Sequence, residues 1–321
     1  MKNSPILIVA GEPYSIFIEI FLKAFNKIKV KKKIILIVSK KLFIKQMKKL
    51  NFKYQINLLD NKNLNLKNLS KTKINIININ FNFKKTFDTI SNRSNSYIEE
   101  SFDTALKLMK TKKFKGLING PISKRNFLRN KSLGITEYLA NKTNRNNKVS
   151  MLIYNKKLSV CPITTHLPLK NVYKKITKKN INYQIKLIHS FYKRKMKINP
   201  KIAITGLNPH CESNYNSSEE DKIIKPVIKS LKKRKYNVKG PFSADTIFMN
   251  ENSKSYDVIV GMYHDQVLTP AKTLFGFNSI NITLGLPFIR ISPDHGPNNA
   301  MIGKNKSNPQ SLIEALKFLN N

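Results

Sequence analysis

The sequence predicts an α/β protein in which strands and helices alternate along the chain. Residues 5–10 form an apolar run that predicts a buried first strand, and Gly11-Glu12-Pro13 predicts the turn after it. Residues 16–28 carry apolar side chains at helical spacing, and residues 33–38 predict a second strand. This order of strand, turn, helix and strand, with short connections, is typical of α/β architecture.

The later elements continue this alternation. Ser96 and Glu99 have the spacing of a capping box, which predicts a helix start at that point. The buried face of that helix is expected to comprise Ile98, Phe102, Ala105, Leu106 and Met109. Residues 51–82 are rich in Asn and Lys and predict only a variable region of strands and loops. We expect further helices over residues 42–50, from 134 onward, and over 183–192, 223–231 and 311–319, and further strands over 116–121, 151–154, 158–163, 202–206, 258–260 and 280–284.

The chain is strongly basic. Its 321 residues include 59 Lys and Arg against 18 Asp and Glu, which gives a formal net charge of +41. Such an excess suits nucleic-acid binding. However, the lysines are spread over many short runs, and the aromatic residues lack the regular interleaving of a single-strand stacking surface. We therefore keep nucleic-acid binding as an alternative only, and note that a positive field also attracts phosphorylated substrates and anionic cofactors.

The cysteine content and the length of the apolar runs indicate in which cellular compartment the protein is expected. Cys161 and Cys211 are too few and too far apart for a disulfide framework, which favours a reducing environment. The run from Ile6 to Ala10 is too short for a signal peptide, and no stretch approaches the length of a membrane span. We expect a soluble, cytoplasmic protein that has no membrane partner.

Residues 257–299 form the segment richest in chemically active side chains. An apolar run is followed there by the polar cluster Tyr263-His264-Asp265-Gln266. In open α/β sheets, ligands bind where strands deliver their carboxyl ends. Lys272, Asn281 and Arg290 add two cations and an amide within twenty residues. This combination predicts a site for a charged small molecule, with an ordinary solvated surface as the alternative for Lys272 and Arg290.

Three of the five histidines follow predicted strands. His166, His210 and His264 could together hold a divalent metal with one coordination position left open. Because 44 and 54 residues separate them and no local metal motif is present, three ordinary loop histidines are the alternative. Asp245 and Asp265 could orient these histidines or could cap turns. The first strand is not followed by G-x-G-x-x-G, and there is no P-loop, so a Rossmann dehydrogenase is disfavoured.

Seven segments together form a recognisable pattern. They are residues 120–124 (GPISK), 164–169 (TTHLPL), 206–210 (GLNPH), 244–246 (ADT), 263–266 (YHDQ), 281–290 (NITLGLPFIR) and 294–296 (DHG). These segments resemble the 4-hydroxythreonine-4-phosphate dehydrogenases of pyridoxal phosphate biosynthesis. The similarity runs in family order from residue 6 to about residue 316, and its C-terminal block is highly specific.

The resemblance implies a fold similar to that of the isocitrate and isopropylmalate dehydrogenases. That fold has two α/β domains with a cleft between them. It also implies a homodimer that holds the metal at the subunit interface, with ligands from both chains. We expect a discontinuous first domain of residues 1–125 plus 265–321 and a second domain of residues 126–264.

The resemblance also implies a set of site residues. The metal (Zn, Mg, Mn or Co) would be held by His166, His210 and His264. The phosphorylated substrate would be bound by Thr136, Lys272, Asn281 and Arg290. The cofactor is expected to be NAD, with NADP possible, and to be held partly by His295, Gly296, Gly303 and Asn308.

The implied reaction is NAD-dependent oxidation of 4-phosphooxy-L-threonine at C3, followed by decarboxylation to 3-amino-2-oxopropyl phosphate. A metal suits both steps as a Lewis acid, and Arg and Lys suit the binding of phosphate and carboxylate. One alternative is a paralogue that acts on 4-phospho-threonate or 4-phospho-erythronate. Another is a basic nucleic-acid-binding protein on an inherited enzyme fold, which would bind random DNA in a salt-sensitive manner.

Two positions depart from the family pattern. Ile135 stands where the family usually has a histidine, just before the threonine of its Gly-x-Thr-Glu motif. An apolar side chain cannot donate a hydrogen bond to a substrate oxygen, so that contact is lost or supplied elsewhere. The turn after the first strand is usually richer in glycine than the residues Tyr14 to Ile18 found here.

Overall fold

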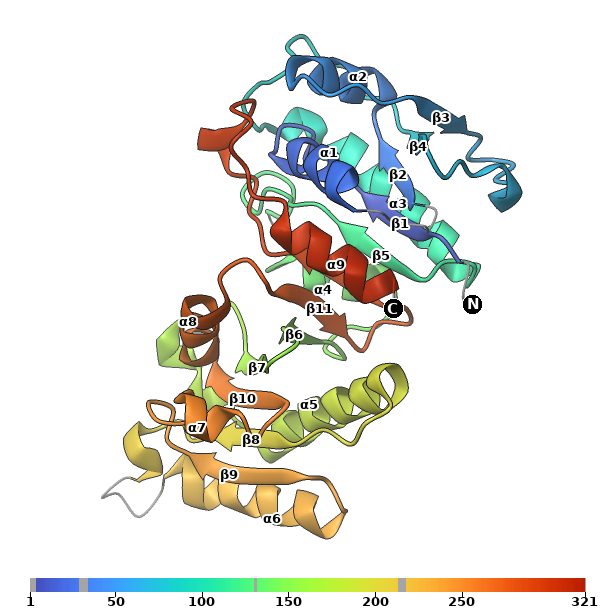
Figure 1. Ribbon diagram of the computed structural model, residues 1–321. Coiled ribbons are helices and arrows are strands. Elements are labelled where there is room, and N and C mark those ends of the chain that lie inside the picture. Colours follow the sequence, from blue (N-terminus) through green and yellow to red (C-terminus); the bar gives the residue numbers. More distant parts are fainter. Residues whose placement is uncertain (1–3, 29–33, 130–131, 213–217, 321) are drawn as a thin grey trace. The chain divides into compact units, whose positions relative to one another are not determined.

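The structure is a computed structural model that describes residues 4–28, 34–129, 132–212 and 218–320. The chain forms two compact units, drawn as ribbons in Figure 1. The first unit comprises Met1–Thr143 and Pro287–Asn321, and the second comprises Asn144–Leu286. The first unit is discontinuous, but both boundaries lie later in the chain than the expected 125/126 and 264/265.

The first unit is a parallel α/β sheet with helices packed against it. Its strands are β1 (Ile6–Val9), β2 (Ile34–Val38), β3 (Ile56–Leu59), β4 (Ile74–Asn78), β5 (Gly116–Asn119) and β12 (Arg290–Pro293). Its helices are α1 (Phe17–Lys27), α2 (Lys40–Lys49), α3 (Asn95–Lys110), α4 (Ile135–Lys142) and α9 (Gln310–Asn320), with 3-10 turns at Leu66–Asn68, Asn92–Ser94 and Asn299–Met301.

The strand order of this unit is β3-β4-β2-β1-β5-β12, and its neighbouring strands run parallel. The central strand β1 is fully buried, as expected for a parallel sheet covered on both faces. Helices α1 and α9 contact each other in front of the sheet in Figure 1, while α3 packs behind it on β1, β2 and β5. The last strand and helix of the chain therefore complete a sheet that its first residues begin.

The second unit has a mixed sheet in the order β11-β6-β7-β10-β8-β9. An antiparallel part (β11, β6 and β7) adjoins a parallel part (β7, β10, β8 and β9). The strands are β6 (Ser150–Tyr154), β7 (Ser159–Thr164), β8 (Ile202–Thr205), β9 (Val238–Phe242), β10 (Val258–Tyr263) and β11 (Ile280–Leu284). The helices are α5 (Lys178–Phe191), α6 (Lys225–Lys233), α7 (Asn250–Ser253) and α8 (His264–Phe275), with 3-10 turns at Leu169–Asn171, Tyr173–Lys175 and Pro209–Cys211 and π turns at Tyr192–Met196 and Glu220–Ile224.

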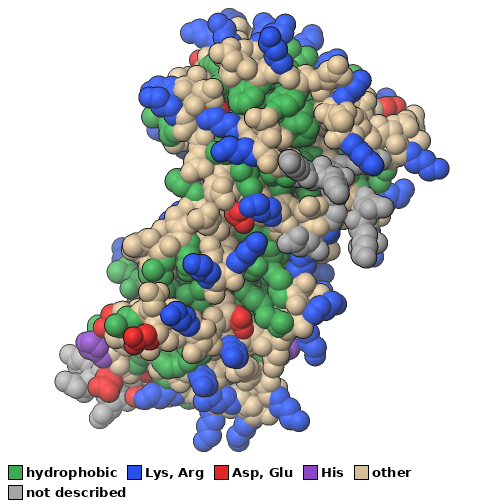
Figure 2. All heavy atoms as spheres, viewed as in Figure 1, with side chains coloured by type: hydrophobic (Ala, Val, Ile, Leu, Met, Phe, Trp, Pro, Cys, Tyr) green, Lys and Arg blue, Asp and Glu red, His purple; other side chains and the backbone are tan. Residues whose placement is uncertain are grey.

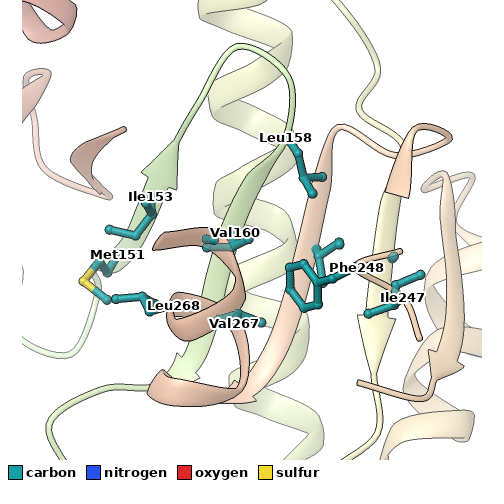
Figure 3. Close-up of a cluster of buried hydrophobic side chains, with 11 residues drawn as sticks. Met151, Ile153, Leu158, Val160, Ile247, Phe248, Val267 and Leu268 are labelled. Atoms are coloured by element: carbon teal, nitrogen blue, oxygen red, sulfur yellow. The ribbon is translucent and has the colours of Figure 1, made fainter. Parts of the chain in front are cut away.

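Helix α8 packs on one face of this sheet. Figure 3 shows Leu268 pointing toward Met151 of β6, and Val267 lying beside Val160 of β7. A Cβ at Gly261 would lie 2.4 Å from Val267 Cγ1, so glycine lets α8 fold back tightly on β10. The helix begins at the residue after the strand. The strand predicted over residues 258–260 therefore continues for three further residues, Gly261 to Tyr263, and a helix follows it directly.

Packing explains where the boundary between the units falls. Tyr138 of α4 lies against Phe102 of α3 and against Phe127, with ring centroids 5.9 and 5.2 Å apart, which holds residues 126–143 in the first unit. Strand β11 pairs with β6, and α8 packs on β7, which holds residues 265–286 in the second unit. Sequence patterns do not reveal either contact.

The start of α3 differs from the sequence prediction. The helix begins at Asn95 after the 3-10 turn Asn92–Ser94, and the Ser94 side chain makes no capping hydrogen bond. Ser96 and Glu99 therefore lie inside the helix, so the capping-box prediction was wrong. The buried face was predicted correctly: Ile98, Phe102, Ala105, Leu106 and Met109 are all buried.

The distribution of basic side chains bears on nucleic-acid binding, and the length and hydropathy of the helices bear on membrane crossing. On the face shown in Figure 2, Lys and Arg side chains are scattered among neutral ones and do not gather into one patch. Among the described residues, no helix combines the length and hydropathy that crossing a bilayer requires.

Candidate functional site

The three expected metal ligands all follow parallel strands of the second unit. His166 comes two residues after β7, His264 directly after β10, and His210 lies in the Pro209–Cys211 turn after β8. Strands β7, β10 and β8 are neighbours in that order. Because the carboxyl ends of parallel strands meet at one edge of a sheet, the three imidazoles start from the same edge.

Two of these imidazoles are close to each other. The ring centroids of His166 and His264 are 6.1 Å apart. Two imidazoles bound to one tetrahedral ion through Zn–N bonds of about 2.1 Å would have centroids roughly 5 Å apart, so this pair lies near a ligating separation. His210 instead lies beside Asp245, with its Nδ1 3.7 Å from Asp245 Oδ2. In the described part of the chain, no group of three or more His, Cys, Asp and Glu residues is placed to hold a metal ion.

The backbone at two of the histidines is strained. His166 has φ 47° and His210 has φ 54°, in the left-handed region that residues other than glycine rarely adopt. Each such residue costs on the order of 1 kcal/mol or more, and such residues cluster at functional sites. Nine other described non-glycine residues, Cys211 among them, also have a positive φ, so this strain by itself does not distinguish the two histidine loops.

A buried carboxylate that the sequence analysis missed holds the loop before His210. Glu220 Oε1 accepts hydrogen bonds from the Leu207 and Asn208 amides at 2.7 and 2.9 Å, and Glu220 Oε2 accepts from Asn208 Nδ2 at 2.8 Å. Burial alone would raise the pKa of Glu220, but these hydrogen bonds outweigh it and hold the pKa below its ordinary value. Glu220 thus remains a carboxylate that positions the residues leading to His210.

Gln266 plays a similar part beside His264. Its Oε1 accepts hydrogen bonds from the Met262 amide at 2.7 Å and from the Thr205 hydroxyl at 2.9 Å, and its Nε2 donates to the Gly206 carbonyl at 2.9 Å. The side chain therefore ties the end of β10 to the end of β8. Asp265 lies outside this network, with its Oδ1 2.6 Å from His264 Nδ1.

Arg290 forms the centre of a second group, in the first unit. The side chain is fully buried. Its Nε donates to Asn119 Oδ1 at 2.6 Å and its Nη1 to Thr136 Oγ1 at 3.4 Å. Burial lowers the pKa of Arg290 to about 9, and the charge of Glu137 acts in the opposite direction. A guanidinium held in a low dielectric favours an anionic ligand, because an anion offsets the cost of its desolvation.

Thr136 belongs to the first turn of α4, which begins at Ile135. The first amides of a helix have no partner within it, and they favour an anion. Arg290 and the start of α4 therefore make one potential anion site in the first unit.

The other two expected substrate residues belong to the second unit. Lys272 is exposed on α8. Asn281 is half-buried on β11, and its Oδ1 has no hydrogen-bond partner among the described residues. The structure thus brings Thr136 to Arg290 within the first unit and places Lys272 and Asn281 in the second.

The expected cofactor residues fall into two sets. His295 and Gly296 line a pocket of about 940 Å³ in the first unit, whose described lining also includes Asn119 and Ile135. A Cβ at Gly296 would meet no atom within 4 Å, and this glycine's φ is not in the left-handed region, so its missing side chain leaves open space for a ligand. Gly303 and Asn308 do not line this pocket.

Gly303 and Asn308 belong to a segment that α1 holds in place. Glu19 Oε1 accepts from the Ser307 amide at 2.5 Å and from Lys23 Nζ at 2.9 Å. Lys23 also donates to the Asn305 and Ser307 carbonyls at 2.9 and 3.0 Å. We refer to these contacts of Glu19, Lys23, Asn305 and Ser307 as the α1 clamp. The clamp fixes the chain that follows the pocket, and the sequence analysis did not identify it.

Comparison with known proteins gives a consistent result. A sequence profile of the family described as pyridoxal phosphate biosynthetic protein PdxA matches residues 30–319. A 4-hydroxythreonine-4-phosphate dehydrogenase of Sulfurihydrogenibium sp. (strain YO3AOP1) is 38% identical over 315 residues, which is 97% of this chain and 96% of that protein.

Solved structures agree with this result. The fold resembles a putative 4-hydroxythreonine-4-phosphate dehydrogenase from Salmonella typhimurium with a TM-score of 0.85 at 25% identity, covering 99% of both chains. It also resembles the 4-hydroxythreonine-4-phosphate dehydrogenase from Klebsiella pneumoniae with a TM-score of 0.84 at 26% identity, covering 99% of this chain and 98% of that one.

Proposed function

Because the chain belongs to the PdxA family of pyridoxal phosphate biosynthetic proteins, we propose that it oxidises 4-phosphooxy-L-threonine at C3 and that the product decarboxylates to 3-amino-2-oxopropyl phosphate. The chain is an oxidoreductase, and the hydride acceptor is a nicotinamide dinucleotide. The observation that carries the proposal is the buried Arg290, hydrogen-bonded to Thr136 at the start of α4. A phosphorylated, carboxylate-bearing substrate offers the anion that this group of residues favours.

The substrate contacts follow from these residues. Arg290 donates hydrogen bonds to an anionic group of the substrate, and Thr136 and the first amides of α4 complete its ligands. Lys272 and Asn281 of the second unit would supply a second cation and an amide to the substrate. The dinucleotide occupies the pocket at His295 and Gly296, and the segment with Gly303 and Asn308 supports it.

The donor set at the second unit fits a divalent ion. His166, His210 and His264 would hold it, and imidazole nitrogens suit Zn better than Mg or Mn, which prefer oxygen ligands. When bound, such an ion would supply Lewis acidity for both the oxidation and the decarboxylation. Asp265 accepts a hydrogen bond from His264 Nδ1, so Nε2 would be the nitrogen available to a metal. Asp245 makes no such hydrogen bond to His210, because its Oδ2 lies 3.7 Å from His210 Nδ1.

A homodimer is part of the proposal, with ligands of each site drawn from both subunits. The second unit exposes several large apolar side chains that an interface between subunits would cover. These residues are Leu169, Tyr173, Met249, Leu274 and Phe277.

One observation favours a second substrate. Ile135 lines the pocket and is half-buried, and an isoleucine offers no hydrogen bond to a substrate amine or hydroxyl. Because Ile135 makes no contact that selects an amine over a hydroxyl, a paralogous activity on 4-phospho-threonate or 4-phospho-erythronate, which carry a hydroxyl in place of the amine, is the second candidate function.

The test is the formation of reduced dinucleotide, followed by ultraviolet absorbance, with each of the three substrates. We expect turnover to be fastest with 4-phosphooxy-threonine, to disappear with a chelator and to return when metal is added. His264→Ala should lower kcat/KM by about 100-fold or more, as loss of a ligand does.

The matched control is His189→Ala, which removes a helix histidine whose ring lies against Tyr236. Turnover that neither the chelator nor His264→Ala changes would contradict the metal mechanism. Turnover that is faster with the threonate or erythronate would favour the second candidate.

A further inference from the structure

We infer that Arg125 and Arg129 bind the 2′-phosphate of NADP, so that this enzyme prefers NADP to NAD. The inference rests on the proposed function, because it assigns the pocket of the first unit to the dinucleotide. It goes further by naming the residues that choose between the two dinucleotides.

The charge of the pocket lining supports this inference. Lys124, Arg125 and Arg129 line the pocket, and no Asp or Glu occurs among its described lining residues. In Rossmann folds a carboxylate of NAD sites accepts a hydrogen bond from the ribose 2′-hydroxyl, whereas an arginine of NADP sites accommodates the 2′-phosphate, and the same charge argument applies to a pocket on another fold. Three cations without a carboxylate match the second arrangement. A carboxylate there would also repel the additional phosphate.

The two arginines are available for a ligand. Both side chains are exposed, and within the described part of the chain neither makes a hydrogen bond or an ion pair. A guanidinium presents two parallel N–H donors to a phosphate, which a lysine ammonium does not. Elsewhere in this unit the cation Lys23 is already held by the α1 clamp.

The segment that carries the two arginines is anchored by buried apolar residues. Phe127 and Leu128 are buried, and the Phe127 ring lies 5.2 Å from that of Tyr138. The Phe127 amide donates to the Ser123 carbonyl at 3.0 Å, and Asn95 Nδ2 donates to the Asn126 carbonyl at 3.2 Å. Because the apolar residues fix this turn in the core, the charged residues on either side of them present their side chains to the pocket without a large ordering cost.

The opposite side of the pocket leaves room for a nucleotide. Residues His295 to Asn299 line it, and the space beside Gly296 is open. The pocket volume of about 940 Å³ is at the upper end of the range for small-molecule sites, as a dinucleotide requires.

The experiment measures the dissociation constants of NADP and NAD by calorimetry with the purified full-length chain, and repeats the comparison with the fragments 2′,5′-ADP and 5′-AMP. We expect the wild type to bind NADP at least about tenfold more tightly than NAD, as one charge-assisted hydrogen bond would give. In Arg125→Ala/Arg129→Ala this ratio should fall to about one. In Arg125→Lys/Arg129→Lys, which keeps the charge but not the planar donor pair, it should be intermediate.

The matched control removes the same charge elsewhere in the unit. Lys41 and Lys48 are exposed on α2, so Lys41→Ala/Lys48→Ala should keep the wild-type ratio. Equal wild-type affinities for NADP and NAD, or a ratio unchanged in the double alanine variant, would overturn the inference.

Different results would contradict the proposed oxidation reaction and the inferred 2′-phosphate site. If neither dinucleotide supports oxidation of the phosphorylated substrates but 2′,5′-ADP still binds through the arginines, the proposed reaction is wrong and the phosphate site stands. If oxidation proceeds equally well with NAD and NADP, the proposed reaction stands and the phosphate site does not.

Discussion

Breaking the α1 clamp should destabilise the first unit by an amount that can be estimated from its geometry. Glu19 has 2% of its side chain exposed, and one oxygen, Oε1, accepts from both Ser307 and Lys23. A charge-assisted hydrogen bond contributes about 1.5–3 kcal/mol. Loss of a fully buried ion pair costs about 3–5 kcal/mol, but Lys23 keeps two carbonyl partners and some exposure to water, which lowers that value.

We therefore expect Glu19→Ala to reduce the free energy of unfolding by about 2–3 kcal/mol, and Glu19→Gln by about 1 kcal/mol, because glutamine retains a neutral acceptor. Urea denaturation measures both values. Hydrogen exchange at residues 303–308 should also accelerate in Glu19→Ala, because the Ser307 amide loses its acceptor.

The matched control is Lys317→Ala. It breaks the Glu314–Lys317 pair, in which the lysine is half exposed, and should cost less than about 0.5 kcal/mol. A Glu19→Ala variant as stable as this control, with unchanged exchange at residues 303–308, would refute the role assigned to the clamp.

Two further predictions concern the pH dependence and the anion site. Burial raises the pKa of Glu12 from 4.5 to about 7, so between these values the folded state keeps a proton that the unfolded state has released. Glu12 therefore makes the free energy of unfolding fall as the pH rises through that range, by about 1.4 kcal/mol per pH unit. Urea denaturation from pH 4 to 8 should show this dependence in the wild type, and Glu12→Gln should lack it. Arg290→Lys loses the hydrogen bonds to Asn119 and Thr136, so it should lower kcat/KM by about 100-fold in a steady-state assay. Thr136→Ser keeps a hydroxyl, so its kcat/KM should stay within a few-fold of the wild-type value.

The sequence predicted the α/β fold class and the strands β1, β2, β5, β6, β7, β8, β10 and β11, because buried strands are short apolar runs that stand out against a polar chain. It gave no bounds for β3, β4, β9 and β12. It did not predict α8. The apolar residues Val267, Leu268 and Ala271 have helical spacing, but the polar residues after Val260 and Pro270 inside the segment argued against a helix, and none was predicted there. The unit boundaries were also missed, since they depend on ring contacts and strand pairing between distant residues.

For the candidate site, the sequence predicted which residue types follow which strands but not how they meet. Arg290 and Asn119 are 171 residues apart, and nothing local to either residue marks their hydrogen bond. Three histidines were expected around one ion. The rings of His166 and His264 lie 6.1 Å apart, while His210 lies beside Asp245, so the three-histidine site stays a prediction. Glu220, Gln266 and the α1 clamp hydrogen-bond to the backbone of segments that carry candidate site residues. Such contacts join residues distant in the chain, so a single sequence shows no motif for them.

The strand order of the first unit has a consequence for synthesis on the ribosome. Strand β12 pairs with β5, and α9 packs on β12 and α1, so the first unit lacks one strand and one helix until nearly the whole chain has emerged. During that time β5 presents an unpaired edge to the cell. The second unit is a continuous segment and can fold first, although it comes later in the sequence. A nascent chain of this protein therefore reverses the usual order, in which the domain made first is also the first to be finished.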